Sequence, residues 1–511
     1  MASSVHVAAF PMKGLIYMAM NFLAADLGAS NGRVMMGIFD GEKVCLSEVS
    51  RFSNEYVHVG DADYWDILGI YSNVVKGIAA GAKNSRELSG IGIDTWGVDF
   101  GLIDRQGRLI GNPRSYRDPR GLRGMEAFRG KYGDKAAFEI TGIADNEFNT
   151  LYQLYDMAVT GDPQLEAADK MLLLPDLLGY MLCGEISSEY TISTTTQMMD
   201  AASGGWSEII LEMAGIRGSL MCPITPSGTV KGSLRRYVLQ ETGLEKAPSV
   251  FCVGSHDTAS AVASVPARND DFAFISSGTW SVVGIVSEKE VINETAYNEG
   301  FSNEGAVDGK YRLLRNIMGM WIIQNCKRQW DRVKASGWDD IVESAKGAPP
   351  FRSFIDVSAG VFYDADSMPQ KIQRFCSETG QRVPQTQGEI ARTVYESLAM
   401  SYREAFDGLE KIKGSKIATL HIVGGGSKNS LLNQFAANAI NREVTAGPAE
   451  AAAAGNIMMQ VKASGGVKDM AQMRDVIRGS FAVESYEPKE ADIWDEQYKR
   501  YLAIKKSYKE R

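Results

Sequence analysis

The sequence has few cysteines and few histidines, which limits the metal and disulfide chemistry open to it. Six cysteines stand among 511 residues, never closer than 30 residues to one another. This spacing gives neither the close cysteine pairs of zinc sites nor a disulfide framework, so we expect a reducing, cytoplasmic location. The four histidines come without an H-E-x-x-H or G-x-S-x-G motif, which excludes the zinc-hydrolase and serine-hydrolase classes.

The sequence has no excess of positive charge, because 54 Lys and Arg stand against 63 Asp and Glu, for a net charge of −9. The basic residues are scattered, so we expect no binding to nucleic acid or to an anionic membrane surface. Hydrophobic residues at 44% and charged residues at 23% are typical of folded globular chains. The length predicts two to four domains.

The first 25 residues contain one uncharged stretch, 14–25, that resembles a secretory signal. It is too short to cross a bilayer, which needs about 20 residues. Cleavage near Ala25 would also remove a strand predicted over 21–27. We therefore expect an extended start, with Met18 or Met20 opening the folded protein.

The first half of the chain has the pattern of an α/β domain. Three strands are predicted in a row, and the second and third are joined by Asp40-Gly41, a pair typical of hairpin turns. Strands and helices then alternate. The predicted strands are 21–27, 33–39, 43–50, 89–94, 98–104, 171–175 and 250–253, and the predicted helices are 64–82 and 258–265.

The pattern restarts near residue 266. In both halves an apolar strand meets a turn of small residues, 26–30 and 276–279, and leads at once into another strand. This repetition predicts two related domains that face each other. Further on we predict helices at 386–411, 431–440 and 450–461, a strand at 418–423, and a solvated surface helix from Asp492.

Three small-residue turns are candidates for a polyphosphate site: 28–33, 276–279 and 424–426. Glycine and small residues let backbone N–H groups approach phosphate oxygens closely. Neither a G-x-x-x-x-G-K-[ST] loop nor a G-x-G-x-x-G opening a helix occurs, so the P-loop and Rossmann classes have little support. Each turn alone is typical of a structural hairpin, but three at matching positions indicate a phosphate site.

Two aspartates stand at the ends of apolar strands. Asp26 can hold Mg²⁺ against phosphates, directly or through water, or can cap the turn. Asp257, between His256 and Thr258, can accept a hydroxyl proton as a general base or can cap a helix N-terminus. The local sequence leaves both choices open.

The segment 92–100 combines Asp94, Trp96, Gly97 and Asp99. Carboxylates and rings of this kind suit sugars, whose hydroxyls need acceptors and whose C–H faces stack on aromatic rings. The alternative is a turn with a buried tryptophan. A sugar site could also draw on 116–118, 149–153 and 194–197 of the same half.

Eight segments in sequence order carry a resemblance to a known family. They are A-A-D-L-G-A-S-N-G-R-V (24–34), G-I-D-T-W-G-V-D-F (92–100), F-N-T-L-Y-Q-L (148–154), S-H-D-T-A-S-A-V (255–262), S-S-G-T-W-S (276–281), R-N-I-M-G-M-W-I-I-Q (315–324), L-H-I-V-G-G-G-S-K-N (420–429) and A-G-P-A-E-A-A-A-A-G-N (446–456). Together they resemble the FGGY family of carbohydrate kinases, from about residue 21 to about 490.

The resemblance implies an α/β fold with two ribonuclease-H-like domains of the actin-like ATPase type and an active-site cleft between them. The N-terminal domain, 21–262, would hold the sugar site and the first phosphate turn. The C-terminal domain, 263–485, would hold the nucleotide site, and 486–511 would form a helical tail.

The resemblance also assigns site residues. Asp257 would be the catalytic base, and Asp26 would be associated with Mg²⁺. The residues implied for the sugar are Gly97, His256, Asp257 and Thr258. The residues implied for ATP are Ala29, Ser30, Asn31, Gly32, Arg33, Thr279, Asn316, Gln324 and Gly425.

The implied reaction transfers phosphate from ATP to the 1-hydroxyl of the ketose L-rhamnulose, giving L-rhamnulose 1-phosphate and ADP. The expected assembly is a monomer or a small homo-oligomer. One alternative is a kinase for another ketose, such as L-fuculose or D-xylulose. A non-enzymatic alternative is a nucleotide switch or a sugar-responsive regulator, which would lack the base or carry a DNA-binding extension.

Overall fold

The computed structural model describes residues 19–510, and the expected start at Met18 therefore lies outside the described residues. The first sheet has the order β11-β12-β6-β1-β2-β3. Its strands are β1 (Met20–Leu27), β2 (Asn31–Phe39), β3 (Val44–Ser53), β6 (Gly90–Thr95), β11 (Thr229–Ser233) and β12 (Ser249–Cys252). β1 and β2 pair antiparallel around the turn at 28–30, and β6 and β12 join in parallel.

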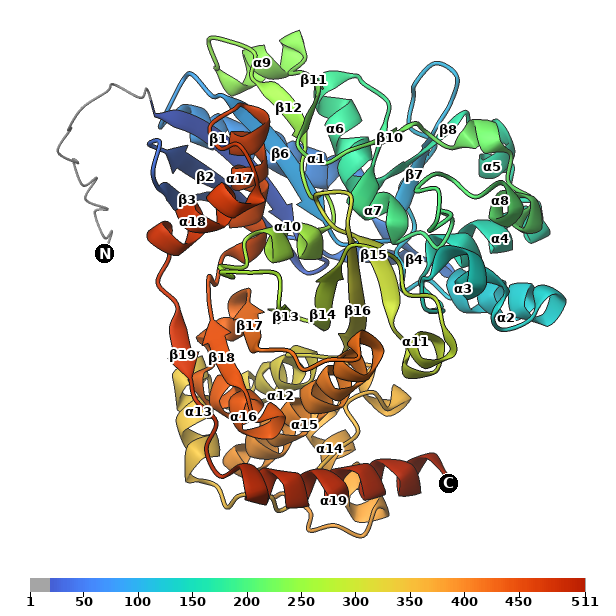
Figure 1. Ribbon diagram of the computed structural model, residues 1–511. Coiled ribbons are helices and arrows are strands. Elements are labelled where there is room, and N and C mark those ends of the chain that lie inside the picture. The colour runs from blue at the N-terminus through green and yellow to red at the C-terminus, as the bar shows by residue number, and fades with distance from the viewer. Residues whose placement is uncertain (1–18, 511) are drawn as a thin grey trace.

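The second sheet repeats this topology, as the restart of the sequence pattern predicts. Its order is β15-β16-β14-β13-β17-β18-β19, with β13 and β14 antiparallel and β17 and β18 parallel to β13. The strands are β13 (Phe272–Ser277), β14 (Ser281–Ser287), β15 (Ser302–Gly305), β16 (Tyr311–Ile317), β17 (Thr419–Val423), β18 (Glu443–Ala446) and β19 (Glu484–Tyr486). In Figure 1 the two sheets lie one above the other.

Each central strand is covered on both faces, which is why β1 is an almost continuous apolar run. Leu23 and Leu27 pack on one face against α1 (Ile67–Ala82) and α6 (Leu174–Cys183). Phe22 packs on the opposite face, because neighbouring side chains of a strand point to opposite sides. That face is covered by α17 (Ala451–Ala463) and α18 (Met470–Ser480).

Two helices lie between the sheets, α10 (Asp257–Ala263) and α17, and Figure 1 shows α10 below the first sheet and above the second. Alanines of α10 contribute to a core with the first sheet and to a core with the second. A Cβ on Gly455 of α17 would lie 1.8 Å from the Ser260 carbonyl of α10. Glycine at this position therefore permits the close contact of the two helices.

The helix predicted over 64–82 begins later, at Ile67. Tyr64 and Trp65 belong to β5 (Ala62–Trp65), which pairs with β4 (Tyr56–Val59). The Asp66 side chain accepts a hydrogen bond from the Gly69 N–H and so caps the helix two residues after the tyrosine. Tyr64 and Trp65, which would also fit the first turn of a helix, therefore pair in the β4–β5 hairpin instead.

Further elements follow the first sheet's strands and enclose a separate apolar core. The strands here are β7 (Phe100–Ile103), β8 (Lys170–Leu173), β9 (Ser188–Glu189) and β10 (Ile224–Thr225). The helices are α2 (Arg120–Tyr132), α3 (Ala136–Thr141), α4 (Thr150–Thr160), α5 (Pro163–Ala167), α7 (Tyr190–Thr194) and α8 (Glu208–Ala214). The helix α9 (Arg236–Thr242) instead packs against α1, with Val238 in the core of the first sheet.

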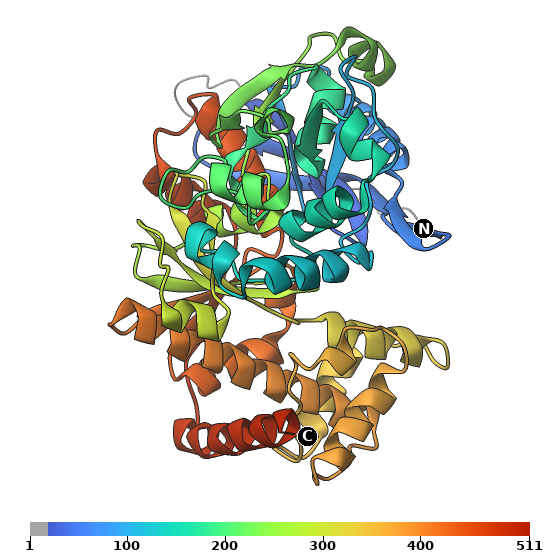
Figure 2. The same cartoon turned by 90° about the vertical axis from the view of Figure 1, so that its right-hand side faces the viewer.

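Most helices of the second half gather on the side of the second sheet that faces away from the first sheet, as Figure 2 shows. They are α11 (Glu294–Glu299), α12 (Trp321–Asp331), α13 (Trp338–Gly347), α14 (Met368–Glu378), α15 (Gln387–Lys413), α16 (Ser430–Ile440) and α19 (Ala491–Lys509). The prediction of α19 as a solvated helix is wrong in part, because Trp494 and Tyr501 are buried in this core.

The six cysteines are all free, as their spacing predicts. Among residues 19–510, no helix combines the length and the apolar character needed to cross a membrane.

Candidate active site

A cleft with a cavity volume of about 320 Å³ lies between the two halves of the molecule. It forms where the turns after β1, β6 and β12 of the first sheet face the turns after β13 and β17 of the second. Loops at the carboxyl ends of parallel strands are common ligand sites in α/β folds. Repetition of one topology thus places two sets of turns around one cavity.

Most of the residues assigned from the sequence line this cleft. They are Asp26, Ala29, Ser30, Arg33, Gly97, His256, Asp257, Thr258, Thr279, Asn316 and Gly425. Asn31, Gly32 and Gln324 do not line it. A Cβ on Gly32 would lie 2.5 Å from the ring of Phe52, so this glycine serves packing within the sheet. Gln324 lies half-buried on α12.

Asp257 is the first residue of α10, and one third of its side chain is exposed. Thr258 Oγ1 donates a hydrogen bond of 3.0 Å to its Oδ1, and the side chain does not cap the helix. Desolvation in the cleft raises the pKa of Asp257 above its usual range, against the opposing effect of His256. A carboxylate with a raised pKa can accept a proton near neutral pH.

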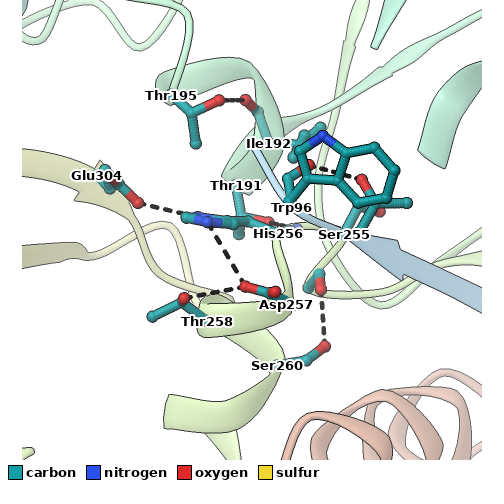
Figure 3. Close-up of polar contacts among 12 residues, drawn as sticks. Trp96, Thr191, Ile192, Thr195, Ser255, His256, Asp257, Thr258, Ser260 and Glu304 are labelled. Atoms are coloured by element: carbon teal, nitrogen blue, oxygen red, sulfur yellow. Dashed lines mark hydrogen bonds and ion pairs between the residues drawn. The ribbon is translucent and has the colours of Figure 1, made fainter. Parts of the chain in front are cut away.

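A buried carboxylate, Glu189, supports the loop that leads to Asp257. Its Oε2 accepts hydrogen bonds from Thr191 Oγ1 at 2.6 Å and from the Ser255 N–H at 3.2 Å. Thr191 Oγ1 in turn accepts a bond from the His256 N–H at 3.2 Å, as Figure 3 shows. The backbone before Asp257 is therefore tied to α7, which limits the positions open to Asp257 and His256.

Asp26 lies at the end of β1, directly opposite Asp94 of β6 in the parallel register. Arg33 donates two hydrogen bonds to Asp26 Oδ2, at 2.7 and 3.0 Å, and also pairs with Glu450 at the start of α17. Burial and the neighbouring Asp26 hold the pKa of Asp94 well above its usual range. Arg33 thus links Asp26 of the first sheet to Glu450, the residue directly before α17.

The carboxylates of 92–100 do not face the cleft, so the hypothesis that they bind sugar hydroxyls is not supported by their positions. Asp94 is fully buried and accepts a 2.6 Å bond from Asn456 of α17. Asp99 Oδ2 accepts bonds from the indole N–H groups of Trp65 and Trp96, at 2.6 and 2.8 Å. Trp96 itself lines the cleft, and Asp99 therefore fixes the ring of a cleft residue.

The turn after β17 supplies open space for a ligand. Gly424 has a φ of 85°, and a Cβ there would lie 2.9 Å from the Ser277 carbonyl. A Cβ on Gly425 would meet no atom within 4 Å. The next residues form a short 3-10 helix, Gly425–Lys428. The two glycines thus leave backbone accessible at the cleft wall, which suits a phosphate group.

Several contacts in the cleft could not be predicted from the sequence, although the candidate sugar segments supply Tyr116, Arg117, Asn149 and Thr195 to its lining. Phe148 and Trp280 face each other from the two halves, with ring centroids 6.3 Å apart, and Arg117 lies over the Trp321 ring at 5.0 Å. Glu304 of β15 also lines the cleft. Their partners are distant in sequence, so local patterns carry no signal for these contacts, although Arg117 stood in the candidate sugar segment 116–118 and Trp280 directly follows the predicted turn 276–279.

The chain matches a known family over most of its length. Residues 21–263 match the N-terminal domain of the FGGY family of carbohydrate kinases, and residues 273–464 match the C-terminal domain of the same family. A protein of Bacteroides thetaiotaomicron named rhamnulokinase is 40% identical over 481 residues, covering 94% of this chain and 98% of that protein. A rhamnulokinase of Bacillus subtilis is 36% identical, covering 93% and 96%.

Solved structures share the fold at low sequence identity. The gluconate kinase from Lactobacillus acidophilus superimposes with a TM-score of 0.79 at 15% identity, covering 96% of this chain and 98% of that chain. The Plasmodium falciparum glycerol kinase with ADP gives a TM-score of 0.76 at 16% identity, with the same coverage. The two-domain α/β architecture is therefore that of sugar kinases.

Replacing Asp99 by asparagine should change how stability depends on pH. Burial raises the pKa of Asp99 from 3.8 to about 6. Between these values the folded state keeps a proton that the unfolded state has lost, so stability falls as pH rises, by ~3 kcal/mol in total. Asparagine removes this loss and can still accept from both indoles. The melting temperature of Asp99→Asn relative to wild type should therefore rise from pH 4 to pH 7.

Calorimetric scans at both pH values measure this difference, with exposed Asp61→Asn as the control that stays level with wild type. An Asp99→Asn difference that is equal at pH 4 and pH 7 would contradict the account.

Proposed function

Because the chain belongs to the FGGY family of carbohydrate kinases, we propose that it transfers the γ-phosphoryl group of ATP to the 1-hydroxyl of L-rhamnulose. The products are L-rhamnulose 1-phosphate and ADP. The ketose is the one that the names of relatives at 35–40% identity indicate. The observation that supports the chemistry is the meeting of Asp257 from one half and Gly425 from the other in one cleft.

The chain's own residues account for each step of the transfer. Asp257 accepts the proton of the 1-hydroxyl as that oxygen forms its bond to the γ-phosphorus. The bond from the γ-phosphorus to the bridging oxygen breaks, and ADP keeps the electron pair. Phosphoryl transfer depends chiefly on positioning and on charge stabilisation. Trp96 and Gly97 form the wall on which the sugar lies.

The nucleotide phosphates fit between the turn Gly28–Ser30 and the turn Gly424–Gly425. Thr279 and Asn316 line the same side of the cleft. Asp26 offers a carboxylate on the cleft wall, and oxygen donors of this kind suit Mg²⁺. Mg²⁺ bound with ATP would neutralise charge on the phosphate oxygens. Arg33, which holds Asp26 Oδ2, is placed to exchange that partner for a phosphate.

The cleft spans both halves, so a change in their separation would open or close the site. Closure excludes water and so limits the hydrolysis of ATP. We further propose that the protein acts in the cytoplasm as a monomer or a small homo-oligomer, consistent with its six free cysteines and its net charge of −9.

A panel of acceptors tests the proposed function. ADP release with Mg·ATP should give the highest kcat/KM for L-rhamnulose among L-rhamnulose, L-fuculose, D-xylulose and glycerol, since this ratio defines specificity. A higher ratio for another ketose would refute the substrate and keep the reaction. A folded protein that binds ATP and a ketose but releases no ADP would favour a regulator.

Asp257→Asn should lower kcat by about 10²-fold to 10⁴-fold, because a general base contributes that much, and should leave sugar and ATP binding within a few-fold. Stopped assays and calorimetric titration measure the two effects. Asp270→Asn, which changes an exposed carboxylate paired with Arg474, is the matched control and should keep full activity. Turnover close to wild type in folded Asp257→Asn would remove the base assignment.

Gly425→Val should weaken ATP binding at least tenfold while leaving sugar binding within twofold, because the added side chain enters open space in the cleft. Titration calorimetry with each ligand measures both. Gly218→Val is the control, since Gly218 also begins a 3-10 helix with nothing within 4 Å but lies outside the cleft lining. Equal weakening of both ligands would contradict the assignment.

A further inference from the structure

One carboxylate of the second sheet reaches the histidine beside the base. Glu304 lies on β15, and its Oε2 is 2.9 Å from His256 Nδ1. The other ring nitrogen, Nε2, is 3.7 Å from Asp257 Oδ1. Figure 3 shows the three side chains in a row, with the imidazole between the two carboxylates. The row crosses from one half of the molecule to the other.

The contact between Glu304 and His256 determines where the ring carries a proton. Burial opposes ionisation of Glu304, but His256 and Arg312 outweigh it and hold the pKa of Glu304 below its usual range. An ionised carboxylate only accepts hydrogen bonds. At a separation of 2.9 Å this carboxylate favours a proton on Nδ1, because two lone pairs at that distance would repel each other.

Arg312 fixes the carboxylate in turn. This fully buried arginine of β16 donates to Glu304 Oε2 at 3.0 Å and to the Gly305 carbonyl at 2.8 Å. Its Nη2 also lies 3.2 Å from His256 Nδ1. With Glu304 present, the arginine has an acceptor other than the ring. Without that charge, Arg312 would compete for the Nδ1 lone pair and favour the opposite tautomer.

We propose that Glu304 is a positioning residue for the transfer reaction, which fixes the ring and the proton of His256 so that Nε2 faces Asp257 and the cleft. The proposal rests on the proposed function and adds a requirement to it. Glu304 stands on the second sheet and His256 on the first half, so the ring is held correctly only while the two halves are in contact. Glu304 thereby connects the arrangement of the halves to the geometry of the base.

A double-mutant cycle tests whether Glu304 acts through His256. Glu304→Gln keeps the shape and an acceptor for Arg312, and should lower kcat for L-rhamnulose about tenfold, since small misplacements of reacting groups have effects of this order or more. The KM for ATP should stay within twofold. In the His256→Asn background, Glu304→Gln should lower kcat no further. An equal loss in both backgrounds would overturn the proposal.

Glu288→Gln is the matched control for these assays. Glu288 follows β14 of the same sheet and forms an exposed ion pair with Lys310. Its kcat should equal that of wild type, because the same change from carboxylate to amide is made away from the cleft.

A second measurement does not depend on turnover. The chain has four histidines, so ¹⁵N-histidine NMR gives a sparse spectrum in which His256→Asn identifies the His256 signals. Wild type should show a proton on Nδ1, and Glu304→Gln should shift these signals while leaving the other histidines unchanged. A His256 spectrum that is the same in both proteins would overturn the proposal. Failure of wild type to phosphorylate any sugar would refute the proposed function and leave this comparison intact.

Discussion

The contact between α10 and α17 is the interaction on which the rest of the site depends. The two helices meet between the sheets, and Gly455 and the small residues of α10 let their backbones approach closely. α10 begins with Asp257 and α17 begins with Ala451, and both residues line the cleft. A bulkier interface would separate the sheets and would move Asp257 away from the turn at Gly424 and Gly425. Small residues in these helices therefore serve the geometry of the site as much as packing.

A second constraint is the concentration of carboxylates around a cleft that should receive a polyanion. Burial and the neighbouring Asp26 raise the pKa of Asp94 and of Asp257. Arg33 balances this charge by pairing with Asp26 and with Glu450. Arrival of ATP with Mg²⁺ would bring both a cation for Asp26 and phosphates for Arg33. Under the proposed function, the carboxylates of the cleft would favour the metal–nucleotide complex over the nucleotide alone.

Much of the fold could be predicted because its signals are local. The strand–turn–strand units, the hairpin at Asp40 and Gly41, and the helix after His256 follow from apolar runs and turn residues. The repetition of these units predicted the two facing sheets. Three features could not be predicted in this way. Tyr64 joins a hairpin instead of a helix, α19 buries Trp494, and α17 packs on the first sheet although it lies far along the chain.

The candidate site likewise combines residues that local sequence signals predict with residues whose contacts come from distant segments. Residues at strand ends and in the following turns, such as Asp26 and Gly425, could be placed because the end of a strand and its turn lie at one edge of a sheet. Asp94 and Glu304 could not, since their environments are set by Asn456 and His256 from distant segments. The most direct test of the account is a crystal structure with L-rhamnulose, Mg²⁺ and a non-hydrolysable ATP analogue. The account predicts the 1-hydroxyl oxygen within about 3.2 Å of the Asp257 carboxylate and the γ-phosphate between Gly28–Ser30 and Gly424–Gly425. An ordered ketose with its 1-hydroxyl against another group would contradict it.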